Sequence, residues 1–177
     1  MDKIFSEKAY DEMIGRLFVR FPSFQKTGAS AYKPGIANME FFDQLAGHPH
    51  RQYKTIHVAG TNGKGSVAHI LASILQQAGY RVGLFTSPLL TDFRERIRIN
   101  GEMISEEAVC EFVELAQPII ADLQPSFFEV TTAMAFHYFA EQQVDVAVIE
   151  HGTIVAGEDD EGVVEQALLL KGAYDFS

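Results

Sequence analysis

A glycine-rich turn between a strand-like run and a helical pattern is the feature that most limits how this chain can fold. The run YKTIHV, residues 53–58, has strand propensity, and the segment GTNGKGS, residues 60–66, follows almost directly. The next stretch repeats apolar residues at helical spacing, at Val67, Ile70, Leu71, Ile74 and Leu75. A strand, a glycine turn and a helix in this order are typical of a parallel α/β sheet.

The rest of the chain continues this alternation. Helical patterns cover residues 6–20, 36–47, 66–79, 105–123 and 128–142, and strand-like runs cover residues 53–58, 81–87 and 144–150. The run RIRINGEMI, residues 96–104, predicts a β-hairpin, because Asn100-Gly101 suits a two-residue turn with positive φ. We therefore expect an α/β fold with residues 53–58 as a central strand of a parallel sheet.

The glycine turn also indicates a ligand. Such a turn leaves backbone N–H groups free at a helix N-terminus, where small residues let a phosphate approach, and Lys64 adds a positive charge. The standard phosphate-loop pattern is G-x-x-x-x-G-K-[ST]. This chain departs from it twice, with Val58 at the first glycine position and Gly65 between Lys64 and Ser66. A tight turn with an exposed lysine is the alternative.

Composition excludes several classes of partner. The chain carries 14 Lys and Arg against 24 Asp and Glu, a net charge of −10, which argues against nucleic acid or an anionic membrane as the main partner. The 177 residues contain no apolar run of membrane-spanning length, and the polar start lacks the core of a secretory signal. The single Cys110 cannot form an intramolecular disulfide, and we expect it to be packed in the core. A cytoplasmic protein is the resulting expectation.

The shifted loop HVAGTNGKGS resembles the phosphate loop of folylpolyglutamate synthases, which are members of the Mur ligase superfamily. Further segments resemble this family in the same order: FPSFQKTG, GLFTSP, FRERIRINGEMI, FFEVTTAMAFHYF and VDVAVIE. The resemblance runs from about Phe21 to Glu150, which is most of the chain. It implies a parallel sheet of the P-loop NTPase-like type found in the Mur ligase central domain, here incomplete.

The resemblance implies an ATP-dependent ligase that joins a carboxylate to an amine. ATP would phosphorylate the terminal carboxylate of a folate, and the amine of L-glutamate would attack the acyl phosphate. The implied cofactors are ATP and Mg²⁺, and the implied partners are a folate (tetrahydrofolate or dihydropteroate) and L-glutamate, bound by a monomer. An additional dihydrofolate synthase activity stays open.

The resemblance also assigns residues to the nucleotide. The loop residues that would hold the ATP phosphates are Gly60, Thr61, Asn62, Gly63, Lys64, Gly65 and Ser66. The family's Mg²⁺ ligands map to Ser87 and Glu150. Both residues end predicted parallel strands, at the edge where α/β sheets bind ligands, and hard oxygen ligands suit Mg²⁺. The alternatives are an ordinary turn before Pro88 and a solvated strand end at Glu150.

The segment from Pro88 to Arg96 resembles the family's mobile loop beside the folate site. Phe93, Arg94 and Arg96 are the candidates for folate contacts, with the arginines suited to substrate carboxylates. Structural roles in the hairpin are equally open for both arginines. Glu129 lies at a helix start, where capping of free N–H groups is favoured over catalysis.

The resemblance stops after Glu150. Residues 151–177 carry six acidic residues and one lysine, and Gly152 alone matches the family's next glycine-rich turn. We expect residues 1–150 to form the N-terminal part of an ATP-binding domain and residues 151–177 to be a divergent acidic tail, frame-shifted or non-native. The C-terminal glutamate-ligase domain is expected to be absent. A truncated chain of this kind would be inactive alone, and a non-catalytic nucleotide-binding fragment is the alternative function.

Overall fold

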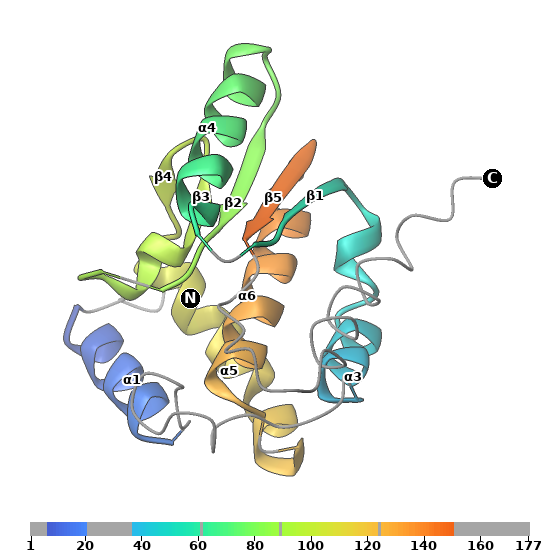
Figure 1. The fold of residues 1–177 in the computed structure, drawn as a ribbon. Helices are drawn as coiled ribbons and strands as arrows, with labels where there is room; N and C mark the ends of the chain where they lie inside the picture. The colour runs from blue at the N-terminus through green and yellow to red at the C-terminus, as the bar shows by residue number, and fades with distance from the viewer. Residues whose placement is uncertain (1–6, 21–36, 61, 89, 124, 151–177) are drawn as a thin grey trace, which may run out of the picture.

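A five-stranded sheet forms the centre of the computed structural model, which describes residues 7–20, 37–60, 62–88, 90–123 and 125–150. The strands are β1 (Lys54–Val58), β2 (Val82–Phe85), β3 (Ile97–Ile99), β4 (Glu102–Met103) and β5 (Val146–Glu150). Their spatial order is β1-β5-β2-β3-β4 (Figure 1). Strands β1, β5 and β2 are parallel, and β3 and β4 continue the sheet in antiparallel pairing. The expected α/β fold is confirmed.

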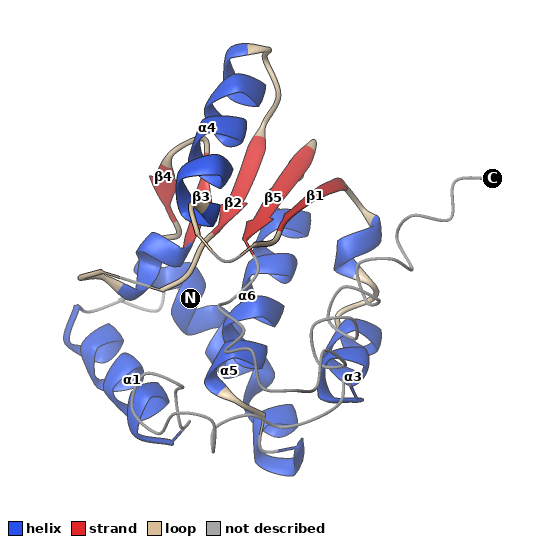
Figure 2. Ribbon diagram, in the orientation of Figure 1, coloured by secondary structure: helices blue, strands red, loops and turns tan. Residues whose placement is uncertain are grey.

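Helices cover both faces of this sheet (Figure 2). They are α1 (Glu7–Arg20), α3 (Ala37–Leu45), α4 (Lys64–Gln77), α5 (Glu106–Leu123) and α6 (Phe127–Glu141), with 3₁₀ turns η2 (Pro49–Arg51) and η3 (Phe93–Arg96). Helix α4 packs on one face, while α6 packs on the other, with α5 and α3 against it and α1 against α5. None of the helices described here is both long and apolar enough to cross a bilayer.

Strand β5 shows how the sequence divides the core. Successive side chains of a strand point to opposite faces. Val146 and Val148 accordingly join the apolar cluster beneath α4, whereas Ala147 and Ile149 join the larger cluster with α5 and α6. All five residues of β5 are buried, as expected for a parallel strand that is covered on both sides.

The prediction of a central position for residues 53–58 is wrong for the described sheet. Strand β5 pairs with both β1 and β2, so β1 lies at the edge of the described strands. The burial of β1 agrees with this position, because only Val58 is fully buried in it. The alternation of strands and helices predicts a parallel sheet but does not give the order of its strands. The predicted parallel relation of β1 and β5 is confirmed.

The predicted hairpin is present between β3 and β4. Asn100 and Gly101 both have positive φ, 49° and 87°, which is the backbone that a two-residue turn of this type requires. Asn100 also ties the hairpin to β2, since its side-chain oxygen accepts from the backbone N–H of Val82 at 2.8 Å. This bond holds the turn of the hairpin against the start of β2.

Two other predictions concern single residues. Glu129 accepts a hydrogen bond from the backbone N–H of Ser126 at 2.6 Å, and the Ser126 hydroxyl accepts from the N–H of Glu129 at 3.2 Å. This reciprocal pair is a capping box at the start of α6, so the capping role of Glu129 is confirmed. Cys110 is buried, as expected. The predicted tail, residues 151–177, lies outside the described residues, as do Thr61 and the segment 21–28.

Candidate functional site

The glycine-rich loop joins the end of β1 to the first residue of α4. Gly63 caps the helix with φ 74° and ψ 2°, a left-handed backbone that glycine adopts without steric cost. Gly63 has no side chain, so no cap hydrogen bond from that position competes with an anion for the amides of the first turn. Lys64 is only 8% exposed, and its Nζ donates to the carbonyl oxygen of Gly60 at 2.8 Å. The alternative of an exposed lysine in a tight turn is therefore wrong.

Glu150 ends β5 beside this loop. Its side chain is buried, at 4% exposure, and its Oε2 accepts from the backbone N–H of Ser87 at 3.1 Å. The register explains this contact, because Phe85 pairs with Ile149 and the next residues of both strands emerge at the same edge. The predicted proximity of Ser87 and Glu150 is confirmed, and a solvated strand end at Glu150 is excluded. Their role in binding a metal stays a prediction.

Gly65 brings the loop and the carboxylate together. A Cβ atom added at Gly65 would lie 3.6 Å from Oε2 and 3.8 Å from Oε1 of Glu150. The first turn of α4 therefore passes directly against the Glu150 carboxylate. The glycine inserted after Lys64, which departs from the standard phosphate-loop pattern, lets the helix backbone lie against that buried carboxylate with no side chain between them.

The oxygen donors at this edge fit a hard divalent cation. Glu150 carries a buried carboxylate, and two residues nearby in the chain trace carry hydroxyl groups: Ser87, in the loop after β2, and Ser66, in the first turn of α4. Within the described ranges, no cluster of three or more His, Cys, Asp or Glu is arranged to hold a metal. A Mg²⁺ ion typically takes one or two protein carboxylates and completes its shell with waters and phosphate oxygens. The donor set thus suits a cation shared with a bound nucleotide.

Arg94 is engaged in contacts within the protein. Its guanidinium donates to both Asp92 oxygens, with Nη2 2.8 Å from Oδ2, and its Nη1 lies 3.4 Å from Oε1 of Glu106. The hydrogen bond from Arg94 lowers the pKa of the Asp92 carboxyl. Arg94 therefore holds η3 against the start of α5.

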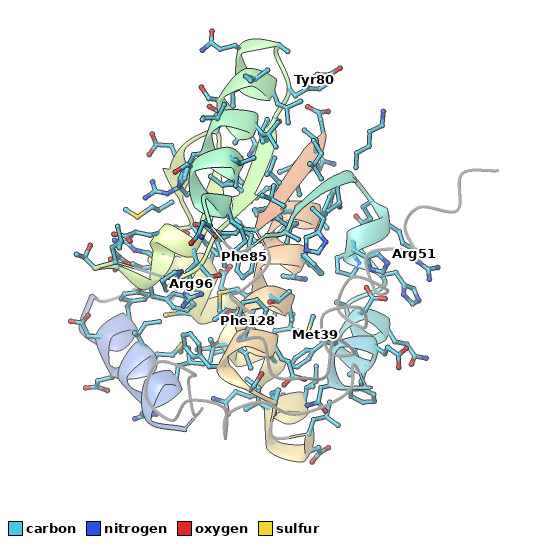
Figure 3. The ribbon with its side chains drawn as sticks, viewed as in Figure 1. Met39, Arg51, Tyr80, Phe85, Arg96 and Phe128 are labelled. Atoms are coloured by element: carbon cyan, nitrogen blue, oxygen red, sulfur yellow. The ribbon has the colours of Figure 1, made fainter. Side chains whose placement is uncertain are left out.

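Arg96 has a different environment two residues later. Its side chain is buried, and its Cζ lies 5.5 Å from the centroid of the Phe127 ring. Burial lowers the pKa of the Arg96 guanidinium to about 10, while the negative charge of Glu150 acts in the opposite direction. The backbone carbonyl of Arg96 accepts from the N–H of Thr86 at 3.0 Å. In Figure 3, Arg96 lies near Phe85, at the opposite end of the strands from Tyr80.

Phe93, the third folate-side candidate, is buried at 4% exposure. Its ring meets Phe127 edge to face, with centroids 6.0 Å apart. This position suits packing beneath the loop and supports the ring on which Arg96 lies. A direct contact between Phe93 and a folate stays a prediction.

A capping box in the loop was missed from the sequence, although its signal is there. Asp92 and Glu95 form the pattern D-x-x-E, and the structure shows both reciprocal hydrogen bonds of the box at the start of η3. Glu95 also accepts from the Thr91 hydroxyl at 2.7 Å and from the backbone N–H of Leu90 at 3.0 Å. Phe127 was missed too, because it begins a mostly apolar helix and nothing local marks it.

Comparison with known proteins identifies relatives of this chain. The chain is 43% identical over 144 residues to the dihydrofolate synthase/folylpolyglutamate synthase of Bacillus subtilis, covering 77% of this chain and 33% of that protein. The crystal structure of folylpolyglutamate synthase from Thermotoga maritima matches with a TM-score of 0.71 at 48% identity, covering 82% of this chain and 33% of the other. The chain belongs to the folylpolyglutamate synthase family.

A second folylpolyglutamate synthase structure, from Mycobacterium tuberculosis, is a complex with ADP. It matches with a TM-score of 0.72 at 35% identity, covering 82% of this chain and 32% of the other. No family model matches the chain. The chain spans about a third of the length of these folylpolyglutamate synthases.

Proposed function

We propose that this chain supplies the ATP-binding part of a ligase that adds L-glutamate to a folate. The observation that carries the proposal is the meeting of the buried Lys64, the glycine loop and the buried Glu150 at one edge of the sheet. The ADP complex of the M. tuberculosis relative supports a nucleotide as the ligand. The names of the relatives support a folate as the acceptor of glutamate.

The reaction would proceed in two substitutions. A carboxylate oxygen of the folate attacks the γ-phosphorus of ATP, and ADP leaves with the electrons of the broken P–O bond. The amine of L-glutamate then attacks the acyl carbon, inorganic phosphate leaves, and the amine loses a proton as the amide forms. Phosphoryl transfer of this kind depends mainly on positioning and on neutralising charge.

The described residues would supply both the positioning and the charge neutralisation. The first-turn amides of α4 and the positive end of its dipole would hold the phosphates, with Lys64 as a point charge among them. The carbonyl of Gly60 keeps the Lys64 ammonium over the loop before any phosphate arrives. Ser87 and Glu150 would hold Mg²⁺, which would neutralise charge on the phosphate oxygens when bound. Inactivity of the chain alone, a monomeric state and a cytoplasmic location stay predictions.

Titration calorimetry with ATP and Mg²⁺ tests this proposal. Removing the Lys64 ammonium in Lys64→Ala should weaken binding by about tenfold or more, because hydrogen bonds to charged groups contribute about 1.5–3 kcal/mol. Lys54→Ala is the matched control, since Lys54 is an exposed lysine at the other end of β1. Equal affinity in wild type and Lys64→Ala, or no binding by wild type, would contradict the proposal.

A further inference from the structure

Arg94 and Arg96 look alike in the sequence, but the structure gives them different partners. Two carboxylates bind the Arg94 guanidinium, those of Asp92 and Glu106. For Arg96, neither Nε nor Nη1 has a hydrogen-bond partner in the part of the chain that the structure describes, although the residue is only 5% exposed. Buried donors on a charged group are costly when unpaired. Such a group is expected to have a ligand.

The position of Arg96 indicates where that ligand would lie. Its backbone pairs with Thr86, the residue before Ser87, so it stands next to the proposed metal ligands. The Glu150 charge favours the charged form of Arg96, yet the structure records no hydrogen bond or ion pair between these two described residues. The opposite charges of these two buried side chains therefore interact at this edge of the sheet, and no ion pair between them is recorded.

Binding of a cation at Glu150 would change this balance. The carboxylate charge would then be shared with the cation, and Arg96 would lose most of its compensating negative charge. An anionic group placed between them would restore the balance and satisfy the free donors of Arg96. Arginine is well suited to carboxylates and phosphates in such buried positions.

We propose that Arg96, and not Arg94, binds the carboxylate of the acceptor substrate and holds it beside the phosphate site. The proposal rests on the proposed function, because it takes a folate-like acid as the acceptor. The phosphates already have Lys64 and the α4 amides, and Arg94 is held by two carboxylates, so of the two arginines Arg96 is left for the acceptor. The Phe127 ring beside it adds an apolar wall that suits an aromatic acid.

The test compares two probes of nearly the same shape, one with carboxylates and one with neutral amides in their place. Folic acid and its diamide, in which both carboxylates are amidated, are titrated against the wild-type chain, Arg96→Met, Arg96→Lys and Arg94→Met. Wild type should bind the acid at least about tenfold more tightly than the diamide, as expected for charge-assisted hydrogen bonds. Arg96→Met should lose this preference, Arg96→Lys should keep part of it, and Arg94→Met should keep it. Equal preference in wild type and Arg96→Met, or no preference in wild type, would overturn the proposal.

Two further measurements separate ligand binding from a structural role. Thermal unfolding should show that Arg96→Met is at least as stable as wild type, since it removes an unpaired buried charge, whereas Arg94→Met should melt lower. A fall in melting temperature for Arg96→Met as large as that for Arg94→Met would overturn the proposal in favour of a structural role.

Titration with ATP and Mg²⁺ provides the second separation. Arg96→Met should keep wild-type affinity for ATP. A loss of ATP affinity with the acid preference intact would identify a phosphate as the ligand and overturn the proposal. Failure of wild type to bind ATP would count against the proposed function, while the comparison of acid and diamide would still decide the role of Arg96.

Discussion

The backbone N–H of Ser87 donates to Oε2 of Glu150 across 3.1 Å, although 63 positions separate the two residues in the sequence. The parallel pairing of β2 with β5 produces this contact, because both strands end at the same edge. The bond orients a buried carboxylate that also lies against Gly65. The sheet itself, rather than a flexible loop, thus sets the position of the candidate metal ligand.

Gly65→Ala should weaken the binding of ATP and Mg²⁺ without lowering the stability of the fold. Alanine is favoured over glycine within a helix by about 0.5–1 kcal/mol, so the substitution should leave stability unchanged or raised. The new methyl group would lie 3.6 Å from Oε2 of Glu150 and crowd any cation or water there. Calorimetry with ATP and Mg²⁺ should show affinity reduced by about tenfold, corresponding to roughly 1–2 kcal/mol. Unchanged affinity would show that the carboxylate faces no ligand beside Gly65.

Gly83→Ala should destabilise the fold. An added Cβ would come within 2.8 Å of the Phe139 ring, which packs directly on this buried position of β2. Overpacking of this kind costs about 1–3 kcal/mol, measurable by denaturant unfolding. Gly15→Ala is the control, because nothing lies within 4 Å of that site in α1 and its expected effect has the opposite sign, a gain of about 0.5–1 kcal/mol. A loss of similar size at both sites would refute the packing argument.

Glu95 should make stability depend on acidic pH. The hydrogen bond from the Thr91 hydroxyl, followed by that from the Leu90 N–H, lowers the pKa of Glu95 from 4.5 to about 2. Because the folded pKa is lowered, the stabilisation is fully present above about 4.5 and is lost as the pH falls through about 2. Wild type should therefore have a higher melting temperature than Glu95→Gln at pH 6, and this difference in melting temperature should disappear towards pH 2.

Thr91→Val provides the matched variant for this titration. It removes the first donor to Glu95 while keeping the shape of the side chain. The fall in melting temperature caused by Glu95→Gln should be smaller when the substitution is made in Thr91→Val than when it is made in wild type. A difference that is constant from pH 6 to about pH 2 would show that the Glu95 charge has no part in holding the loop.

The sequence predicts those parts of the site that depend on strand ends. Lys64 and Ser87 follow recognisable apolar strands and Glu150 ends one. Parallel strands bring their carboxyl ends to one edge of the sheet. The edge position of β1 was not predictable, since the order of strands depends on long-range pairing through β5. The ion pair between Arg94 and Glu106 of α5 also depends on long-range packing, so it could not be assigned from the sequence. The two arginines could therefore not be told apart.

If Glu150 binds the cation that accompanies ATP at the Lys64 loop, the binding of ATP should depend on Mg²⁺ through this carboxylate. The affinity of wild type for ATP should rise as Mg²⁺ is added. Glu150→Gln, which keeps the shape of the side chain and removes its charge, should lose most of that rise. Glu141→Gln, at an exposed glutamate ending α6, should behave as wild type. The same rise in Glu150→Gln as in wild type would contradict this role of Glu150.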